Sequence, residues 1–236
     1  MEALQRLHNR GSISTGYDID NSICFEDDNS ESVTNNYSGD GDRRTWTYST
    51  WVKKVKFGSS QFDYAYMFAG QNTGIYFLNS GILRVGLYNG SSTVYANPAQ
   101  VFRDGSAWYN IIVILDTTQG TAADRVKIYI NGVKVTVWDS YTTYENMSQN
   151  TELTIGQASA NYQVGYFYAG GGSNYGFNGY MAETHYVNGT AKAHTDFGKF
   201  DADTGIWVPI EYTGSHGSKG FYLKFDDSSN LGKDSS

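Results

Sequence analysis

Cysteine, basic residues and long apolar runs are all scarce in this chain of 236 residues. Its one cysteine, Cys24, excludes a disulfide within the chain. Because Cys24 stands in an apolar run, we expect a buried, unreactive thiol. The 17 Lys and Arg residues are outnumbered by 24 Asp and Glu residues, which gives a net charge of −7. A nucleic-acid partner is not expected, since such proteins concentrate basic side chains on one face.

Two further absences bear on where the protein is made. No segment reaches the roughly 18 apolar residues of a membrane-spanning helix, so we expect no membrane insertion. The first 12 residues lack the apolar core of a secretory signal peptide, so secretion by that route is not expected. With a single cysteine, the chain is typical of a protein made in a reducing cytoplasm.

Aromatic residues and glycine are abundant, with 20 Tyr, 12 Phe, 5 Trp and 27 Gly. Aromatic side chains suit pleated strands, and glycine suits the tight turns between them. Residues 45–52 alternate between two faces, and residues 108–115 are apolar on both faces, as in a central strand. Asn131-Gly132, between the alternating segments 126–130 and 133–137, is a strong hairpin signal. The sequence predicts an all-β, two-sheet antiparallel sandwich of the jelly-roll type, with further strands at residues 21–26, 64–68, 74–79, 82–88, 151–155, 179–187 and 220–227.

The order of four segments resembles a known family. These are Ser22-Ile23-Cys24-Phe25, the segment TWTYSTWVK around residues 45–53, the pair WYNIIVIL and KIYING at residues 108–115 and 127–132, and FNGYMAE at residues 177–183. Together they resemble the concanavalin-A-like lectin and laminin-G-like sandwich over roughly residues 20–190. The resemblance implies that fold, in a family whose members include glycan-binding, calcium-binding and β-glucan-hydrolysing proteins.

A narrower resemblance concerns residues 102–109, 120–127 and 203–214. They are similar to versions of this domain in structural proteins of tailed bacteriophages. The resemblance implies a component of the virion: a tail fibre, a tail-associated adhesin or a head-surface protein. It also implies other virion proteins as partners and a homo-oligomer within the particle.

The chain is expected to have three parts. Residues 1–16 form an N-terminal arm, in which Leu4 and Leu7 make one amphipathic turn that is too short to be stable alone. We therefore expect this arm to dock on a partner during assembly. Residues 17–212 form the sandwich, and residues 213–236 a C-terminal strand and a linker to a further module.

One segment, residues 162–180, places aromatic residues among Gly and Asn rather than on alternating strand positions. It is expected to be too flexible for strand in its middle. Tyrosine combines a flat apolar face with a hydroxyl group, which suits recognition of sugars or protein surfaces. The alternative is that the segment covers an open end of the sandwich or packs on another subunit. The candidate glycan- or partner-binding residues are Tyr162, Tyr166, Phe167, Tyr168, Tyr175 and Phe177.

Acidic residues supply the candidates for catalysis and calcium binding. Glu26 and Glu31 have the spacing of a retaining β-glucanase pair, which requires both acids on one supported strand. The polar residues between them favour a turn instead, so no catalytic pair is predicted. Carboxylates in turns can hold Ca²⁺. The weak calcium candidates are Asp27, Asp28, Asp40 and Asp42, with ordinary polar loops as the alternative, and no other cofactor is expected.

The histidines and glycines show no catalytic or zinc-binding pattern. No two of the four histidines have the spacing of a zinc site, and there is no nucleophile elbow or phosphate-binding loop. His185, beside Glu183, is predicted to make an internal hydrogen bond. We therefore predict a non-enzymatic virion surface module for assembly, host-glycan attachment or both. The alternatives are a free-standing carbohydrate-binding lectin domain and, with less support, a glycoside hydrolase.

Overall fold

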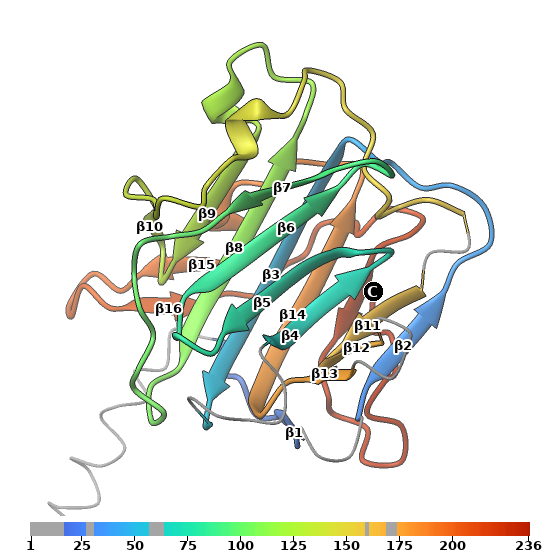
Figure 1. Cartoon of the computed structure of the whole chain (residues 1–236). Helices are drawn as coiled ribbons and strands as arrows, with labels where there is room; N and C mark the ends of the chain where they lie inside the picture. The colour runs from blue at the N-terminus through green and yellow to red at the C-terminus, as the bar shows by residue number, and fades with distance from the viewer. Residues whose placement is uncertain (1–16, 27–30, 57–63, 159–160, 169–173) are drawn as a thin grey trace, which may run out of the picture.

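The computed structural model describes residues 17–26, 31–56, 64–158, 161–168 and 174–236. Its long strands form two antiparallel sheets that face each other (Figure 1). The predicted two-sheet antiparallel sandwich is confirmed. In the described ranges, no helix is long and apolar enough to cross a membrane.

One sheet has seven strands in the order β1-β14-β3-β8-β9-β10, with β17 also paired to β14. The other has six strands in the order β2-β11-β4-β5-β6-β7, and two small hairpins, β12–β13 and β15–β16, lie outside both. The bounds are β1 Ile23–Phe25, β2 Val33–Asn36, β3 Thr45–Lys54, β4 Tyr64–Gly70, β5 Thr73–Leu78, β6 Leu83–Tyr88, β7 Thr93–Ala96, β8 Tyr109–Asp116, β9 Val126–Ile130, β10 Val133–Lys134, β11 Asn161–Val164, β12 Tyr166–Tyr168, β13 Asn174–Gly176, β14 Gly179–Asn188, β15 Gly198–Phe200, β16 Trp207–Pro209 and β17 Phe221–Leu223. Within the described ranges, three short 3-10 helices span Ala122–Asp124, Tyr144–Asn146 and His194–Asp196.

The main core lies between the two sheets and is rich in aromatic rings. Trp46 and Tyr48 of β3 are fully buried, and the Tyr48 ring stacks on Phe68 of β4 in the opposite sheet at 4.9 Å between centroids. Such ring pairs hold the sheets in register because their offset geometry is specific. The predicted alternation along β3 is therefore confirmed for its inward residues.

A second apolar cluster covers the outer face of the seven-stranded sheet. It joins Ile112 and Ile114 of β8 to Val187, Phe197 and Trp207. The hairpin β15–β16 thus covers β8 from outside, and the predicted burial of this strand on both faces is confirmed from residue 110 to residue 115.

Trp207 fixes the hairpin in place. Its Nε1 donates a 2.9 Å hydrogen bond to Oδ1 of the buried Asn110. A Cβ atom on either Gly132 or Gly198 would overlap the indole ring, so both positions require glycine. Gly132 also has φ +75° and Asn131 has φ +48°, the left-handed pair of the predicted Asn-Gly turn, which is confirmed between β9 and β10.

Several predicted strands are shorter than expected, among them 21–26 and 220–227, which shorten to β1 and β17, and one is absent. The strand expected at residues 133–137 shortens to β10, which has two residues. The strand expected at residues 151–155 is absent, although Leu153 and Ile155 are buried. There the N–H of Leu153 donates to the carbonyl of Arg43, before β3, and the N–H of Thr154 donates to the carbonyl of Tyr88, in β6. The segment bridges the two sheets instead of joining either ladder.

The predicted burial of Cys24 and of Trp108 was also wrong. Strand β1 has the burial pattern buried–exposed–buried, so Ile23 and Phe25 face the core and the Cys24 thiol faces outward. Trp108 precedes β8 and is 37% exposed. Cys24 follows the two-residue period of a strand, in which the neighbour of a buried side chain points away from the core, whereas Trp108 lies outside the strand to which it was assigned.

The C-terminal segment packs on the sandwich rather than following it as a separate unit. β17 pairs with β14, and Phe221, Leu223 and Phe225 belong to the main core. The described residues 213–236 therefore complete the seven-stranded sheet. A linker to a further module stays a prediction.

The two tryptophans of contrasting burial give a test of the fold. Replacing Trp46 with Ala is expected to lower the free energy of unfolding by about 3–5 kcal/mol, because it leaves a cavity in the main core. Replacing Trp108 with Ala should cost about 1 kcal/mol, since its ring is partly solvated. Urea unfolding of both variants measures the difference, and equal losses would contradict this core.

Candidate functional site

The aromatic segment chosen from the sequence is divided between the core and the surface. Tyr162, Tyr166 and Phe177 are 2%, 6% and 0% exposed, so their proposed role in glycan contact is wrong. The reason is that β11 lies in the six-stranded sheet between β2 and β4, which turns Tyr162 inward. The segment contributes β11, β12 and β13, and the middle of the segment, where strand was not expected, falls at residues 169–173, outside the described residues.

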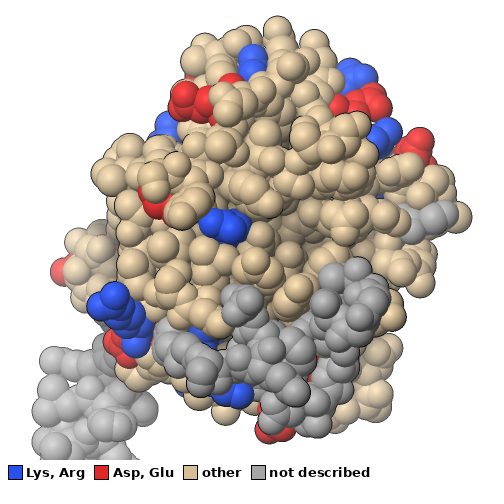
Figure 2. All heavy atoms as spheres, viewed as in Figure 1, with Lys and Arg blue, Asp and Glu red and all other residues tan. Residues whose placement is uncertain are grey.

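The other three aromatic residues lie on the hairpin β12–β13. Phe167 and Tyr175 pack against Tyr66 on the outer face of the six-stranded sheet, at 4.8 Å and 5.8 Å between centroids, and Tyr168 is 59% exposed. Figure 2 shows this side of the molecule, where charged side chains gather mostly at the rim. The hairpin thus covers part of the outer face of this sheet, whereas the alternative interpretation placed the segment over an open end of the sandwich or against another subunit. A ligand role for Phe167, Tyr168 and Tyr175 stays a prediction.

The calcium candidates that the structure describes, Asp40 and Asp42, accept hydrogen bonds from backbone N–H groups. Oδ1 of Asp42 accepts hydrogen bonds from the N–H groups of Arg44 and Thr45, both at 2.8 Å. Oδ1 of Asp40 accepts one from the N–H of Ala158. Within the described ranges, no three His, Cys, Asp or Glu residues are grouped to hold a metal ion. Leu4, Leu7, Asp27 and Asp28 lie outside the described residues.

Glu26 and Glu31 meet through the backbone. The N–H of Glu26 donates a 3.0 Å hydrogen bond to Oε2 of Glu31. Residues 27–30, which join them, lie outside the described residues, so the turn expected there stays a prediction.

A pocket of about 450 Å³ lies elsewhere, on the outer face of the seven-stranded sheet beside the hairpin β15–β16. Its volume falls in the range of small-molecule sites. Three of the chain's five tryptophans line it. The lining comprises Tyr17, Asp18, Ile19, Asp20, Asn21, Ser22, Trp51, Trp108, Ala182, Ile206, Trp207, Val208 and Pro209. We call it the tryptophan pocket.

Three parts of the chain form this pocket. Trp51 of β3 and Ala182 of β14 are paired neighbours in the sheet and lie at its base. Residues 206–209, at β16, provide one wall, and residues 17–22 provide another. At the rim, Trp108 lies beside Lys53, whose Nζ is 5.6 Å from the Trp108 ring and 4.6 Å from the Tyr180 ring. The partly exposed indoles offer flat apolar surfaces, and the wall of residues 17–22 offers polar groups.

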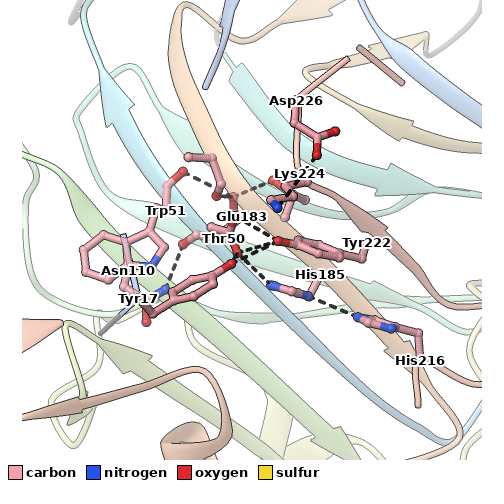
Figure 3. A network of polar contacts seen from close by, with 12 residues as sticks. Tyr17, Thr50, Trp51, Asn110, Glu183, His185, His216, Tyr222, Lys224 and Asp226 are labelled. Atoms are coloured by element: carbon pink, nitrogen blue, oxygen red, sulfur yellow. Dashed lines mark hydrogen bonds and ion pairs between the residues drawn. The ribbon is translucent and has the colours of Figure 1, made fainter. Parts of the chain in front are cut away.

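A buried polar network adjoins the pocket (Figure 3). At its centre is Glu183, which is 6% exposed and has φ +47° at a β-bulge of β14. Its carboxylate accepts hydrogen bonds from the hydroxyl of Tyr17 at 2.6 Å and of Tyr222 at 2.8 and 2.9 Å. Burial raises the pKa of Glu183, but hydrogen bonds from His185, Tyr17 and Tyr222 outweigh it, and the net pKa is lowered. Glu183 is thus held as a carboxylate.

Two histidines extend the network. His185 lies 3.7 Å from Glu183 through Nε2, and its Nδ1 is hydrogen-bonded to Nε2 of His216 at 3.1 Å. The internal hydrogen bond predicted for His185 is therefore confirmed, with His216 as the closer partner. Burial lowers the pKa of His185. Burial, followed by the charge on His185, lowers the pKa of His216 to about 4.

The polar contacts also reach the hairpin. Asn110, which accepts the Trp207 hydrogen bond, donates through Nδ2 to the backbone carbonyl of Thr50 at 3.2 Å. The Thr50 hydroxyl is in turn 2.8 Å from the hydroxyl of Thr184. This chain of contacts crosses β8, β3 and β14 beneath the pocket, which fixes the sheet geometry at its base.

Residues 26–191 match the family model described as the concanavalin A-like lectin/glucanases superfamily. The match covers well over half of the chain, so the chain belongs to this superfamily, as its sequence resemblance indicated. Among curated proteins, none shows significant sequence similarity to it.

Solved structures of low sequence identity share the fold. A heptameric SAP-like pentraxin from Limulus polyphemus has a TM-score of 0.51 and 18% identity, over 75% of this chain and 80% of the pentraxin. A putative carbohydrate binding protein from Bacteroides ovatus has a TM-score of 0.59 and 14% identity, over 88% of this chain and 52% of that protein. The chain thus spans about half of the Bacteroides protein. The tailspike protein 2 of bacteriophage CBA120 has a TM-score of 0.48 and 11% identity, over 75% of this chain and 26% of the tailspike chain.

The buried network predicts a pH dependence of stability. Because the pKa of His216 is lowered from 6.5 to about 4 in the folded state, the unfolded state binds more protons between these values. Stability should therefore fall as the pH is lowered from 7 to 4, by at most about 3 kcal/mol from this residue. Glu183, whose folded pKa is also lowered, adds a loss of the same sign at lower pH. Urea unfolding at pH 7, 6, 5 and 4 measures the slope, which His216→Phe should reduce; an unchanged slope would contradict this assignment.

Proposed function

We propose that this domain binds a glycan in the tryptophan pocket and does not hydrolyse it. The observation that carries the proposal is the joining of Trp51, Trp108 and Trp207 with polar residues of segment 17–22 around one concave space. Aromatic faces pack against the apolar faces of sugar rings, and neighbouring polar groups bond the hydroxyls. Membership of the lectin/glucanase superfamily supports this ligand class.

The absence of hydrolysis is part of the proposal. A glycosidase needs one protonated carboxylic acid as general acid beside a second, ionised carboxylate. Glu183, the buried carboxylate next to the pocket, accepts hydrogen bonds from two tyrosine hydroxyls and is held ionised. Its contacts suit a structural role. Incubation with β-glucans should yield no reducing ends.

The domain would act on the surface of a virion, in assembly, host attachment or both. The support comes from the sequence segments that resemble bacteriophage structural proteins. Two of them, residues 102–109 and 203–214, contain pocket residues: Trp108 in the first and residues 206–209 in the second. The candidate glycan site is thus built partly from the segments that carry this resemblance. A free-standing lectin remains the alternative.

Affinity at a single pocket need not be high in this setting. A Kd of about 1 mM corresponds to a binding free energy of only about −4 kcal/mol. A particle that displays many copies, or a homo-oligomer, gains roughly 10²- to 10⁴-fold in avidity without new contacts.

The pocket is tested with Trp108, because this ring is partly exposed and contributes little to the core. Trp108→Ala should lower glycan affinity at least about 10-fold and change the melting temperature by only a few degrees. Binding is measured on an array of bacterial lipopolysaccharide O-antigens, capsular polysaccharides and β-glucans. Tyr141→Ser, at a residue 69% exposed and outside the pocket lining, is the matched control and should bind normally. Normal binding by the Trp108 variant would contradict the proposed site.

The virion role is tested separately. Mass spectrometry should identify this chain in purified phage particles. Deletion of residues 1–16, which contain Leu4 and Leu7, should leave the domain folded but prevent its incorporation. If the truncated chain is incorporated normally, the arm has no assembly role. If the full chain is absent from particles but binds glycans on the array, the free-standing lectin is the better account.

A further inference from the structure

One wall of the tryptophan pocket is attached to the rest of the domain through a small set of polar contacts. Residues 17–22 precede β1 and line the pocket opposite residues 206–209. The hydrogen bonds seen between this wall and the described remainder of the domain are made by Tyr17, to Glu183 at 2.6 Å and to the hydroxyl of Tyr222 at 3.2 Å. Tyr17 thus fastens the wall at its N-terminal end.

Glu183, the partner of Tyr17, has an unusual backbone conformation with φ +47°. A left-handed φ is unfavourable for a residue with a side chain, and a buried carboxylate is costly unless it is hydrogen-bonded. Both conditions meet at Glu183, at the bulge of an otherwise regular strand. Bulges re-aim side chains beside functional sites. Here Ala182 lines the pocket, and the next residue, Glu183, meets Tyr17.

We infer that Glu183 is a positioning residue of the tryptophan pocket: through the Tyr17 hydroxyl, its carboxylate holds residues 17–22 in the ligand-binding position, and acidification releases them. This inference rests on the proposed glycan function for its ligand, but the latch between Glu183 and Tyr17 can be observed without a ligand. Charge-assisted hydrogen bonds are about twice as strong as neutral ones, so protonation of Glu183 weakens the latch.

Several ionisable groups surround this carboxylate and share its response to pH. His185 lies on the same strand, Tyr17 on the wall, Tyr222 on β17, and His216 in the preceding loop. Charged residues farther out are Glu211, which acts on Tyr17, Lys192 and Asp234, which act on His216, and the pair Lys224–Asp226 beside Tyr222. Protonation of the two histidines at low pH adds positive charge to the network as the negative charge of Glu183 is lost.

The test compares three single substitutions in the full chain. Tyr17→Phe removes the wall's hydroxyl, and Glu183→Gln keeps the shape of the side chain without its charge. Tyr222→Phe removes a donor to the same carboxylate and the longer 3.2 Å contact with Tyr17, but it keeps the 2.6 Å bond between Tyr17 and Glu183. It is therefore the matched control for general damage to the network. Amide hydrogen exchange of residues 18–22 reports the wall directly, and melting temperatures check that each variant is folded.

Tyr17→Phe and Glu183→Gln should speed exchange at residues 18–22 by about 10- to 100-fold at pH 7, the loss expected for a charge-assisted hydrogen bond. Tyr222→Phe should remain close to wild type. Wild-type exchange, corrected for its intrinsic pH dependence, should stay level from pH 7 to pH 5 and rise only below pH 4.5, because the pKa of Glu183 is lowered from that value, and Glu183→Gln should flatten the rise. Equal acceleration in all three variants, or in none, would overturn the inference.

Binding to the O-antigen polysaccharide with the strongest wild-type signal on the array separates this inference from the proposed function. The latch predicts about 10-fold weaker binding by Tyr17→Phe and Glu183→Gln, with binding by Tyr222→Phe retained. If the wild-type chain binds no glycan at all, the proposed function fails, and the exchange rates still decide the latch. Normal glycan binding by Tyr17→Phe with a loosened wall would show that the wall does not position the ligand, which overturns the inference alone.

Discussion

The indole of Trp207 on the outer face of the seven-stranded sheet is the contact on which the rest of this structure depends. Strand β8 is apolar on both faces, and a sandwich of two sheets buries only one. The hairpin β15–β16 covers the other, with Trp207 hydrogen-bonded to Asn110 and enclosed by two glycines. The same hairpin forms a wall of the tryptophan pocket. The hairpin that covers β8 therefore also provides the wall beside which the tryptophan pocket forms.

Local patterns in the sequence predicted much of the sandwich. The two-sided apolar run of β8, the alternation of β3 and the Asn-Gly turn after β9 each have a direct physical meaning, and all three are present. Strand β11 was missed because its glycine-rich surroundings obscure a short alternating segment that is held in place by β2 and β4. Pairing between distant segments, which decides such cases, leaves little local signal. The same limit explains why segment 151–155, in which apolar and polar residues alternate, was taken for a strand.

The candidate site was harder to predict, for a related reason. Its tryptophans come from β3, from the loop before β8 and from β16, and each looks like a core residue in its own segment. The sequence instead drew attention to the tyrosine-rich segment. There, Tyr162 faces the core and Phe167 covers the outer face of the six-stranded sheet, away from the tryptophan pocket. The only part of the Glu183 network that was predicted from the sequence is the internal hydrogen bond of His185. The bulge and the left-handed φ that aim the carboxylate at Tyr17 follow from the fold.

The central claim is that the partly exposed indoles of the tryptophan pocket contact the glycan. The most direct measurement follows the five indole N–H signals by NMR while the best-bound polysaccharide is titrated into the protein. The signals of Trp51 and Trp108 should shift with a common Kd, whereas Trp46 in the core and Trp138, which lies outside the pocket, should not move. Unmoved signals of Trp51 and Trp108 at saturation, with shifts confined to the β12–β13 hairpin, would contradict this account.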